Sequence, residues 1–281
     1  MRKIIIPTDF SDNALNAIRY AVELFKYDRC KFILLHAFAD EVYENNLDMS
    51  RSLFDEYKEK VQESVVQELE ALLKTVKHMS PNPRHEYITK SAFTTLVDAV
   101  NDLAETDNSD VVVMGTRGHT DDRDLTFGSN TLKVVKYVTC PVLAVPSKYT
   151  EWHPKEILFA TPYLMPFRLR ELKLLSTLCE NFKATINFLY VSEYEKLSFR
   201  QQDNIAFLNS CLKENYRQFH TAGGKDTVKT INTFIENEDI DMLVMVNERR
   251  SLLENVLFNN TIDTIGLKVQ VPFLILQNIP R

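Results

Sequence analysis

The chain has 281 residues, with 39 acidic and 33 basic side chains and a net charge of −6 at pH 7. This length allows two domains of roughly 140 residues, each able to bury a hydrophobic core of its own. Lys and Arg are dispersed among Glu and Asp, which argues against general nucleic-acid binding. The apolar run that starts at Ile4 is too short for a signal peptide, and no run approaches the ~20 apolar residues of a membrane span. We therefore expect a cytoplasmic protein.

The first half alternates apolar runs typical of strands with amphipathic segments typical of helices. The expected strands are 3–8, 31–38, 85–89, 110–114 and 141–146. One helix is expected to begin at 11, and three more are expected at 50–79, 92–106 and 129–138. This alternation predicts a parallel, doubly wound sheet. Ligands bind such sheets beyond the carboxyl ends of the strands, where the strand order reverses. Asp9 and Gly115 follow two of these strands, so we expect them to meet at one crevice.

Glycine is rare in this chain, and its placement is the strongest signal for function. The sequence has six glycines, where average usage near ~7% would give roughly 20. Three of the six, Gly115, Gly118 and Gly128, lie between the strand at 110–114 and the helix that starts at Ser129. Glycine lets backbone approach a ligand closely and adopt positive φ, and a helix N-terminus attracts phosphate. We expect Ser129 either to cap the helix or to bond a phosphate.

The pattern Gly115-x2-Gly118-x9-Gly128-Ser129 after a Val-rich strand resembles the nucleotide-binding signature of the universal stress protein family. The opening segment around Pro7, Thr8 and Asp9 resembles that family's first strand, and 140–145 resembles its last. The resemblance implies a five-stranded parallel sheet that binds ATP or another adenine nucleotide. It also implies that Asp9 contacts the adenosine or an associated Mg²⁺. The implied binding residues are Pro7, Thr8, Asp9, Ala37, Met114, Gly115, Arg117, Gly118, Gly128, Ser129 and Asn130.

The second half repeats the spacing of the first. Met114 to Phe127 and Met245 to Phe258 are both thirteen steps, and the apolar runs at 4–8 and 30–37 recur at 157–161 and 184–191. We interpret this as a tandem duplication with domains at 1–147 and 154–281, since the period is too long for a solenoid. The polar segment 146–154, bracketed by prolines, is the expected linker.

Five of the implied binding residues are lost together in the second half, while the apolar pattern persists. The corresponding pairs are Gly115 with Val246, Gly118 with Arg249, Gly128 with Asn259, Ser129 with Asn260 and Asp9 with Pro162. Val246 and Arg249 would place Cβ atoms where phosphates need backbone without side chains. We therefore expect adenine nucleotide in the first domain only.

Other nucleotide chemistries lack their motifs here. The sequence has no G-x4-G-K-[ST] loop, no G-x-G-x-x-G after a strand and no signature of adenylating enzymes. This favours nucleotide binding over turnover, and the resemblance implies a stress-response regulator or sensor rather than an enzyme. The alternatives are a nucleotide-free interaction scaffold and a slow ATPase or autokinase. Asp121, Asp122 and Asp124 would repel a triphosphate unless they face solvent or hold Mg²⁺.

Two further expectations concern partners. The histidines show no ligand spacing, so we expect no structural metal; His36 is either a satisfied strand-end histidine or part of the cleft.

The apolar edge strands at 141–145 and 272–276 would each be an aggregation hazard if left bare. Because a tether raises their effective concentration, we expect them to pair within one chain as a pseudo-dimer, with further homo-oligomerisation open. Protein partners other than the chain itself are not encoded in any motif.

Overall fold

The computed structural model describes residues 1–44, 50–117, 127–164, 166–167, 169–192, 196–213, 216–224, 226–247 and 270–278. These residues form two compact units, with the first ending at Lys148 and the second beginning at Tyr149. No helix within these ranges is long and apolar enough to cross a membrane.

The first unit is a five-stranded, wholly parallel sheet with strand order β3-β2-β1-β4-β5. Its elements are β1 (Arg2–Pro7), α1 (Asp12–Leu24), β2 (Cys30–Ala37), α2 (Ala39–Glu44), α3 (Arg51–Met79), β3 (His85–Ala92), α4 (Leu96–Thr106), β4 (Val111–Gly115), α5 (Ser129–Tyr137) and β5 (Val142–Val145). The doubly wound α/β fold is as predicted. The short helix α2 was not predicted, and β3 runs three residues further than expected.

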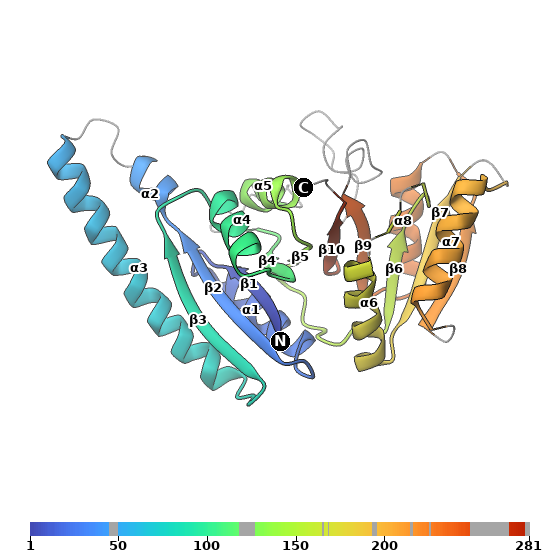
Figure 1. Cartoon of the computed structure of the whole chain (residues 1–281), viewed down its shortest axis with the longest axis horizontal. Coiled ribbons are helices and arrows are strands. Elements are labelled where there is room, and N and C mark those ends of the chain that lie inside the picture. Colours follow the sequence, from blue (N-terminus) through green and yellow to red (C-terminus); the bar gives the residue numbers. More distant parts are fainter. Residues whose placement is uncertain are drawn as a thin grey trace. The chain divides into compact units, whose positions relative to one another are not determined.

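The helices of this unit form two layers, one on each face of the sheet (Figure 1). The connections through α1 and α3 run one way across the sheet and those through α4 and α5 run the other way, so right-handed crossovers place the pairs on opposite faces. Helix α3 packs on β2, β3 and α1, whereas α4 and α5 contact each other. The order reverses between β1 and β4, which makes the carboxyl ends of these strands the expected ligand position.

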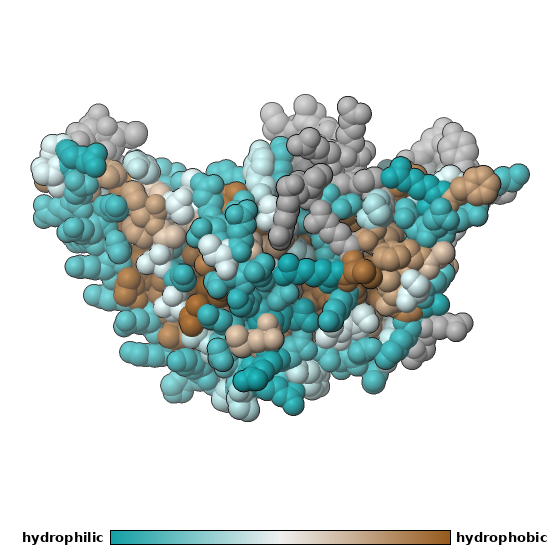
Figure 2. Space-filling view, in the orientation of Figure 1, coloured by the Kyte–Doolittle hydropathy of each residue, from teal (hydrophilic) through white to brown (hydrophobic). Residues whose placement is uncertain are grey.

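Local sequence explains how the helices start and which side they bury. Ser11 caps α1, since its Oγ accepts a hydrogen bond from Ala14 N at 3.2 Å. In α3, a four-residue spacing puts Val61, Val65 and Leu69 on the buried side. The remaining surface of α3 is rich in Glu and Lys, and Figure 2 shows mainly hydrophilic side chains along its outer edge.

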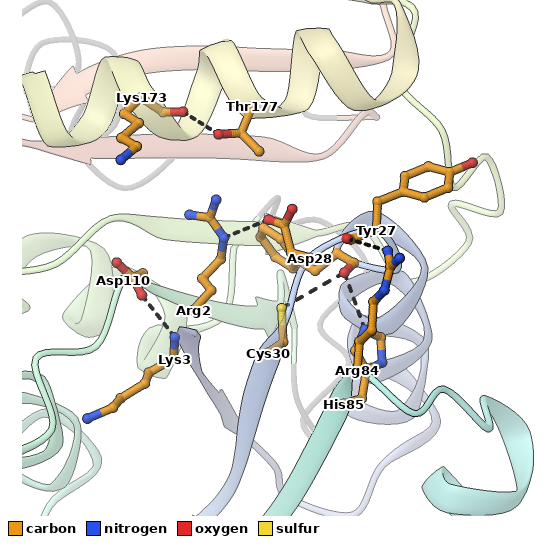
Figure 3. Close-up of polar contacts among 11 residues, drawn as sticks. Arg2, Lys3, Tyr27, Asp28, Cys30, Arg84, His85, Asp110, Lys173 and Thr177 are labelled. Atoms are coloured by element: carbon orange, nitrogen blue, oxygen red, sulfur yellow. Dashed lines mark hydrogen bonds and ion pairs between the residues drawn. The ribbon is translucent and has the colours of Figure 1, made fainter.

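The amino ends of the strands are held by polar contacts (Figure 3). Lys3 N donates to Asp110 Oδ2 at 2.9 Å, and Arg2 Nε pairs with Asp28 Oδ2 at 2.9 Å. His85 Nε2 lies 3.3 Å from Phe25 O, and burial lowers the pKa of this imidazole. These contacts lie at the amino ends of the strands, whereas the ligand is expected at their carboxyl ends.

The second unit has the same topology, with strand order β8-β7-β6-β9-β10, again parallel. Its elements are β6 (Glu156–Ala160), α6 (Leu169–Phe182), β7 (Thr185–Val191), α7 (Phe199–Cys211), β8 (Arg217–Ala222), α8 (Thr227–Asn237), β9 (Met242–Asn247) and β10 (Phe273–Gln277). Asp241 Oδ2 accepts from Glu156 N at 2.9 Å, which matches the Asp110 contact with Lys3 in the first unit. The repeated spacing in the sequence therefore corresponds to repeated hydrogen bonding.

Candidate functional site

The turn between β1 and α1 places Asp9 at the carboxyl end of the central strand. Thr8 N donates to Leu35 O at 2.9 Å, and Thr8 Oγ1 accepts from Phe10 N at 3.0 Å. Phe10 has φ 61, a left-handed conformation that is uncommon for a residue with a side chain. Asp9 Oδ1 accepts from Ser11 N at 3.1 Å and from Ser11 Oγ at 2.5 Å, so the carboxylate is held locally. The sequence around Asp9 thus builds a tight, fixed turn.

The segment after β4 comes close to the start of α1. A Cβ added at Gly115 would lie 3.1 Å from Arg117 O and 3.3 Å from Asn13 O, closer than ordinary van der Waals contact. The buried hydroxyl of Thr131, on α5, donates to Gly115 O at 3.0 Å. Gly115 therefore lies where the β1–α1 and β4–α5 connections meet, and only a residue without a side chain fits there comfortably.

The start of α5 has no side-chain cap. Gly128 is its N-cap residue, Gly128 N donates to Thr116 O at 2.8 Å, and Ser129 and Asn130 are exposed in the first turn. Since Gly128 is the N-cap residue, the structure excludes the first of the two alternatives for Ser129, capping the helix, and the phosphate alternative stays open. The first N–H groups of a helix without such a cap are suited to an anion.

The glycines that the structure describes between β4 and α5 do not use the positive φ that glycine permits. Gly128 has φ −70, and among described glycines only Gly224 has a positive φ. The physical reason is that Gly115 and Gly128 serve close approach and extended backbone, which need no left-handed conformation. Gly118, together with Asp121, Asp122, Arg123 and Asp124, lies outside the described residues.

The remaining predicted residues also lie where the strands of the sheet end. Pro7 ends β1, Ala37 ends β2 opposite Ala92, and Met114 is buried near the end of β4. Arg117 is half-buried and follows Thr116, whose N–H donates to Val145 O at 2.9 Å. Every predicted residue in the described part of the chain thus comes to the carboxyl end of β1, β2 or β4 or to the start of α5.

A pocket of about 470 Å³ lies beside this edge, between the β1–α1 turn and α3. It is lined by Asp9, Phe10, His36, Glu41, Tyr57, Lys60, Val61, Ser64, Val65 and Glu68. His36 Nδ1 donates to Thr8 O at 2.7 Å, and its ring stacks on Phe10 with 4.8 Å between centroids. His36 is therefore both a satisfied strand-end histidine and part of a cleft, the two options left open by the sequence.

The second unit keeps the same turn but fills the space beside it. Tyr163, two residues after Thr161, has φ 56, and its N–H donates to Thr161 Oγ1 at 3.1 Å. Tyr163 is only 3% exposed, and burial raises the pKa of its hydroxyl. Pro162 stands at the position of Asp9 and half-buried Val246 at that of Gly115; Arg249, Asn259 and Asn260 lie outside the described residues.

Three contributors were missed by sequence reasoning. Phe10 forms the pocket wall with His36, Thr131 ties α5 to the end of β4, and Asn13 sets the close approach to Gly115. Only Thr131 had a usable signal, since a Thr two residues after a helix-starting Ser is available for such a bond. Among the described residues, no cluster of three or more His, Cys, Asp or Glu side chains could hold a metal ion.

Comparison with known proteins identifies the family. The family model described as the universal stress protein family matches residues 1–146. Universal stress protein G of Salmonella typhimurium is 34% identical over 147 residues, which cover 51% of this chain and 98% of that protein. A universal stress protein of Methanocaldococcus jannaschii is 30% identical over 148 residues, 51% of this chain and 81% of that protein.

A solved structure extends the likeness in fold to the second unit. A universal stress protein of Archaeoglobus fulgidus superposes with a TM-score of 0.69 at 15% identity, covering 98% of each chain. At this identity the match concerns the fold alone. The family model matches the unit that carries the glycine motif and Asp9. The chain belongs to the universal stress protein family.

Proposed function

We propose that the protein is a stress-response regulator that binds an adenine nucleotide in its first unit only. The observation that carries this proposal is the meeting of Gly115 with the start of α5 at the reversal point of the strand order. A Cβ at Gly115 would lie 3.1 Å from Arg117 O, so glycine lets the backbone come close here, and the first turn of α5 has no side-chain cap. Backbone without a Cβ beside a helix N-terminus suits phosphate oxygens, so the residues present fit such a nucleotide.

The roles follow from position. Ser129 and the N–H groups around Gly118 and Gly128 hold the phosphates, because the helix dipole favours negative charge at its N-terminus. Asp9, at the tip of β1, contacts the adenosine or an associated Mg²⁺, for which a carboxylate is a suitable ligand. The proposal is binding without turnover, since the sequence carries none of the P-loop, dinucleotide or adenylating motifs.

The second unit is a nucleotide-free partner. Pro162 offers no carboxylate at the position of Asp9, and Val246 carries a branched side chain where Gly115 has none. Its fold persists because the strands β6, β7, β9 and β10 keep their buried apolar residues.

Isothermal titration calorimetry of the full chain with Mg-ATP tests the proposal. We expect a stoichiometry of one per chain and about tenfold weaker binding for Ser129→Ala, the size of one lost hydrogen bond to a charged group. The matched control is Ser198→Ala, which removes the capping serine of α7 in the second unit and should leave affinity unchanged. Two equal sites would overturn the restriction to the first unit. No binding, with no nucleotide released from natively purified protein in a mass spectrometer, would favour the interaction scaffold.

A further inference from the structure

The pocket beside Asp9 is separate from the nucleotide position. It lies between the β1–α1 turn and α3, on the face of the sheet covered by α1 and α3. Gly128, Ser129 and Asn130 belong to α5, which packs with α4 on the other face. Of the residues proposed to bind nucleotide, only Asp9 also lines this pocket.

The lining combines negative charge with aromatic and aliphatic surface. Asp9, Glu41 and Glu68 contribute carboxylates and Lys60 an ammonium group, and Glu68 Oε1 accepts from Ser64 Oγ at 3.4 Å. Phe10, His36 and Tyr57 supply ring surface, and Val61 and Val65 form an apolar floor along α3. His36 Nδ1 donates to the Thr8 carbonyl, so of the two ring nitrogens only Nε2 can accept a hydrogen bond. Carboxylates and acceptors beside rings suit a ligand with N–H donors and a positive charge.

The second unit shows what chemistry satisfies this place. There, Gln201 Nε2 donates to Pro162 O at 2.9 Å and Asn204 Nδ2 donates to Tyr163 O at 2.7 Å. Both donors come from α7, the counterpart of α3, and they hold the turn that corresponds to Asp9 and Phe10. The second unit thus meets the turn with side-chain N–H groups of its own. In the first unit a pocket of about 470 Å³ stands at the corresponding turn.

We propose that this pocket binds a small organic cation, an aliphatic amine or guanidinium, whose N–H groups contact the β1–α1 turn as the amides of Gln201 and Asn204 do in the second unit. The cation pairs with Asp9, Glu41 and Glu68, and its carbon chain lies on Val61 and Val65. This site shares Asp9 with the proposed nucleotide site, but α5 takes no part in it, so the two proposals can be tested separately.

Titration of the full chain with putrescine, against 1,4-butanediol as an uncharged probe of the same chain length, tests the proposal. We expect putrescine to bind saturably, with amide chemical-shift changes centred on Phe10, His36 and α3, and butanediol not to bind. Glu68→Gln should weaken putrescine binding about two- to fivefold, the range of one exposed ion pair. The matched control is Glu70→Gln, which changes the same net charge on an exposed position of α3 outside the pocket.

A blocking variant separates this site from the nucleotide site. Ser64 is exposed on α3 and lines the pocket, so Ser64→Phe fills it with little risk to the fold. We expect it to abolish putrescine binding and to leave ATP binding unchanged. The proposal is overturned if butanediol binds as well as putrescine, if Glu68→Gln and Glu70→Gln have equal effects, or if Ser64→Phe removes ATP binding.

Discussion

The turns after β1 and after β6 have the same backbone and opposite surroundings. Both contain a threonine whose Oγ1 accepts from the residue two positions on, at 3.0 Å from Phe10 N and at 3.1 Å from Tyr163 N. Both place that aromatic residue in a left-handed conformation, with φ 61 and 56. The first turn borders a pocket with a carboxylate, whereas the second is packed against α7 through Gln201 and Asn204. The comparison shows that the topology keeps the turn, while side chains decide whether it can take a ligand.

The ends of β4 and β9 differ in the same way. A Cβ atom at Gly115 would lie only 3.3 Å from the Asn13 carbonyl oxygen, whereas Val246 carries a branched side chain at the corresponding position. Both strands are otherwise nearly continuous buried apolar runs. Such runs are what a central parallel strand requires, so the sheet persists with or without a binding site.

The largest expected effect comes from removing the buried aromatic side chain of the turn after β6. Tyr163→Ala removes a buried ring and should lower the free energy of unfolding by about 3 kcal/mol. Phe10→Ala removes a half-buried ring beside a pocket and should cost about 1 kcal/mol. Urea unfolding of both variants followed by tryptophan fluorescence and far-UV circular dichroism measures the difference. Equal costs would show that the two turns are packed alike.

An exchange at the ends of β4 and β9 should affect binding more than stability. Gly115→Val places side-chain atoms within 3.1 Å of Arg117 O, so the loop must shift, and we expect ATP affinity to fall at least tenfold. The reciprocal variant Val246→Gly should lower stability by about 1 kcal/mol and leave ATP stoichiometry unchanged. Calorimetry and thermal unfolding check both. Normal ATP binding by Gly115→Val would show that the phosphates lie elsewhere.

The smallest effect is a pH dependence confined to the first unit. Burial lowers the pKa of His85 below its value of 6.5 in the unfolded chain, so the unfolded state binds the proton more tightly. The stability of the first unit should therefore be lost as the pH falls from 7 through 6.5 and below. His85→Gln should flatten this slope. Amide hydrogen exchange of β3 at pH 7 and pH 5.5 measures it, and the same slope in both proteins would rule out His85 as its source.

Much of the architecture was predictable from the sequence because it depends on local pattern. The strands at 3–8, 31–38, 110–114 and 141–146 were found to within a residue or two, since buried parallel strands are short β-rich apolar runs. The short helix α2 was missed because six residues carry too little periodicity. The sequence predicted that Gly115 lies at the crevice, because it follows a strand. It did not predict that the close approach of Arg117 and Asn13 is what requires glycine there.

The sequence by itself determined the parallel α/β fold of the first unit and the family. It also determined that Asp9, Gly115 and Ser129 gather at the carboxyl ends of the strands. These features follow from spacing along the chain. Only the tertiary structure decided that Asn13 closes on Gly115, that Thr131 anchors α5, and that His36 and Phe10 stack beside a pocket. It also decided that Gln201 and Asn204 fill the equivalent place in the second unit. The physical reason is that these contacts join residues far apart in sequence, whose distances and directions depend on how helices pack on the sheet.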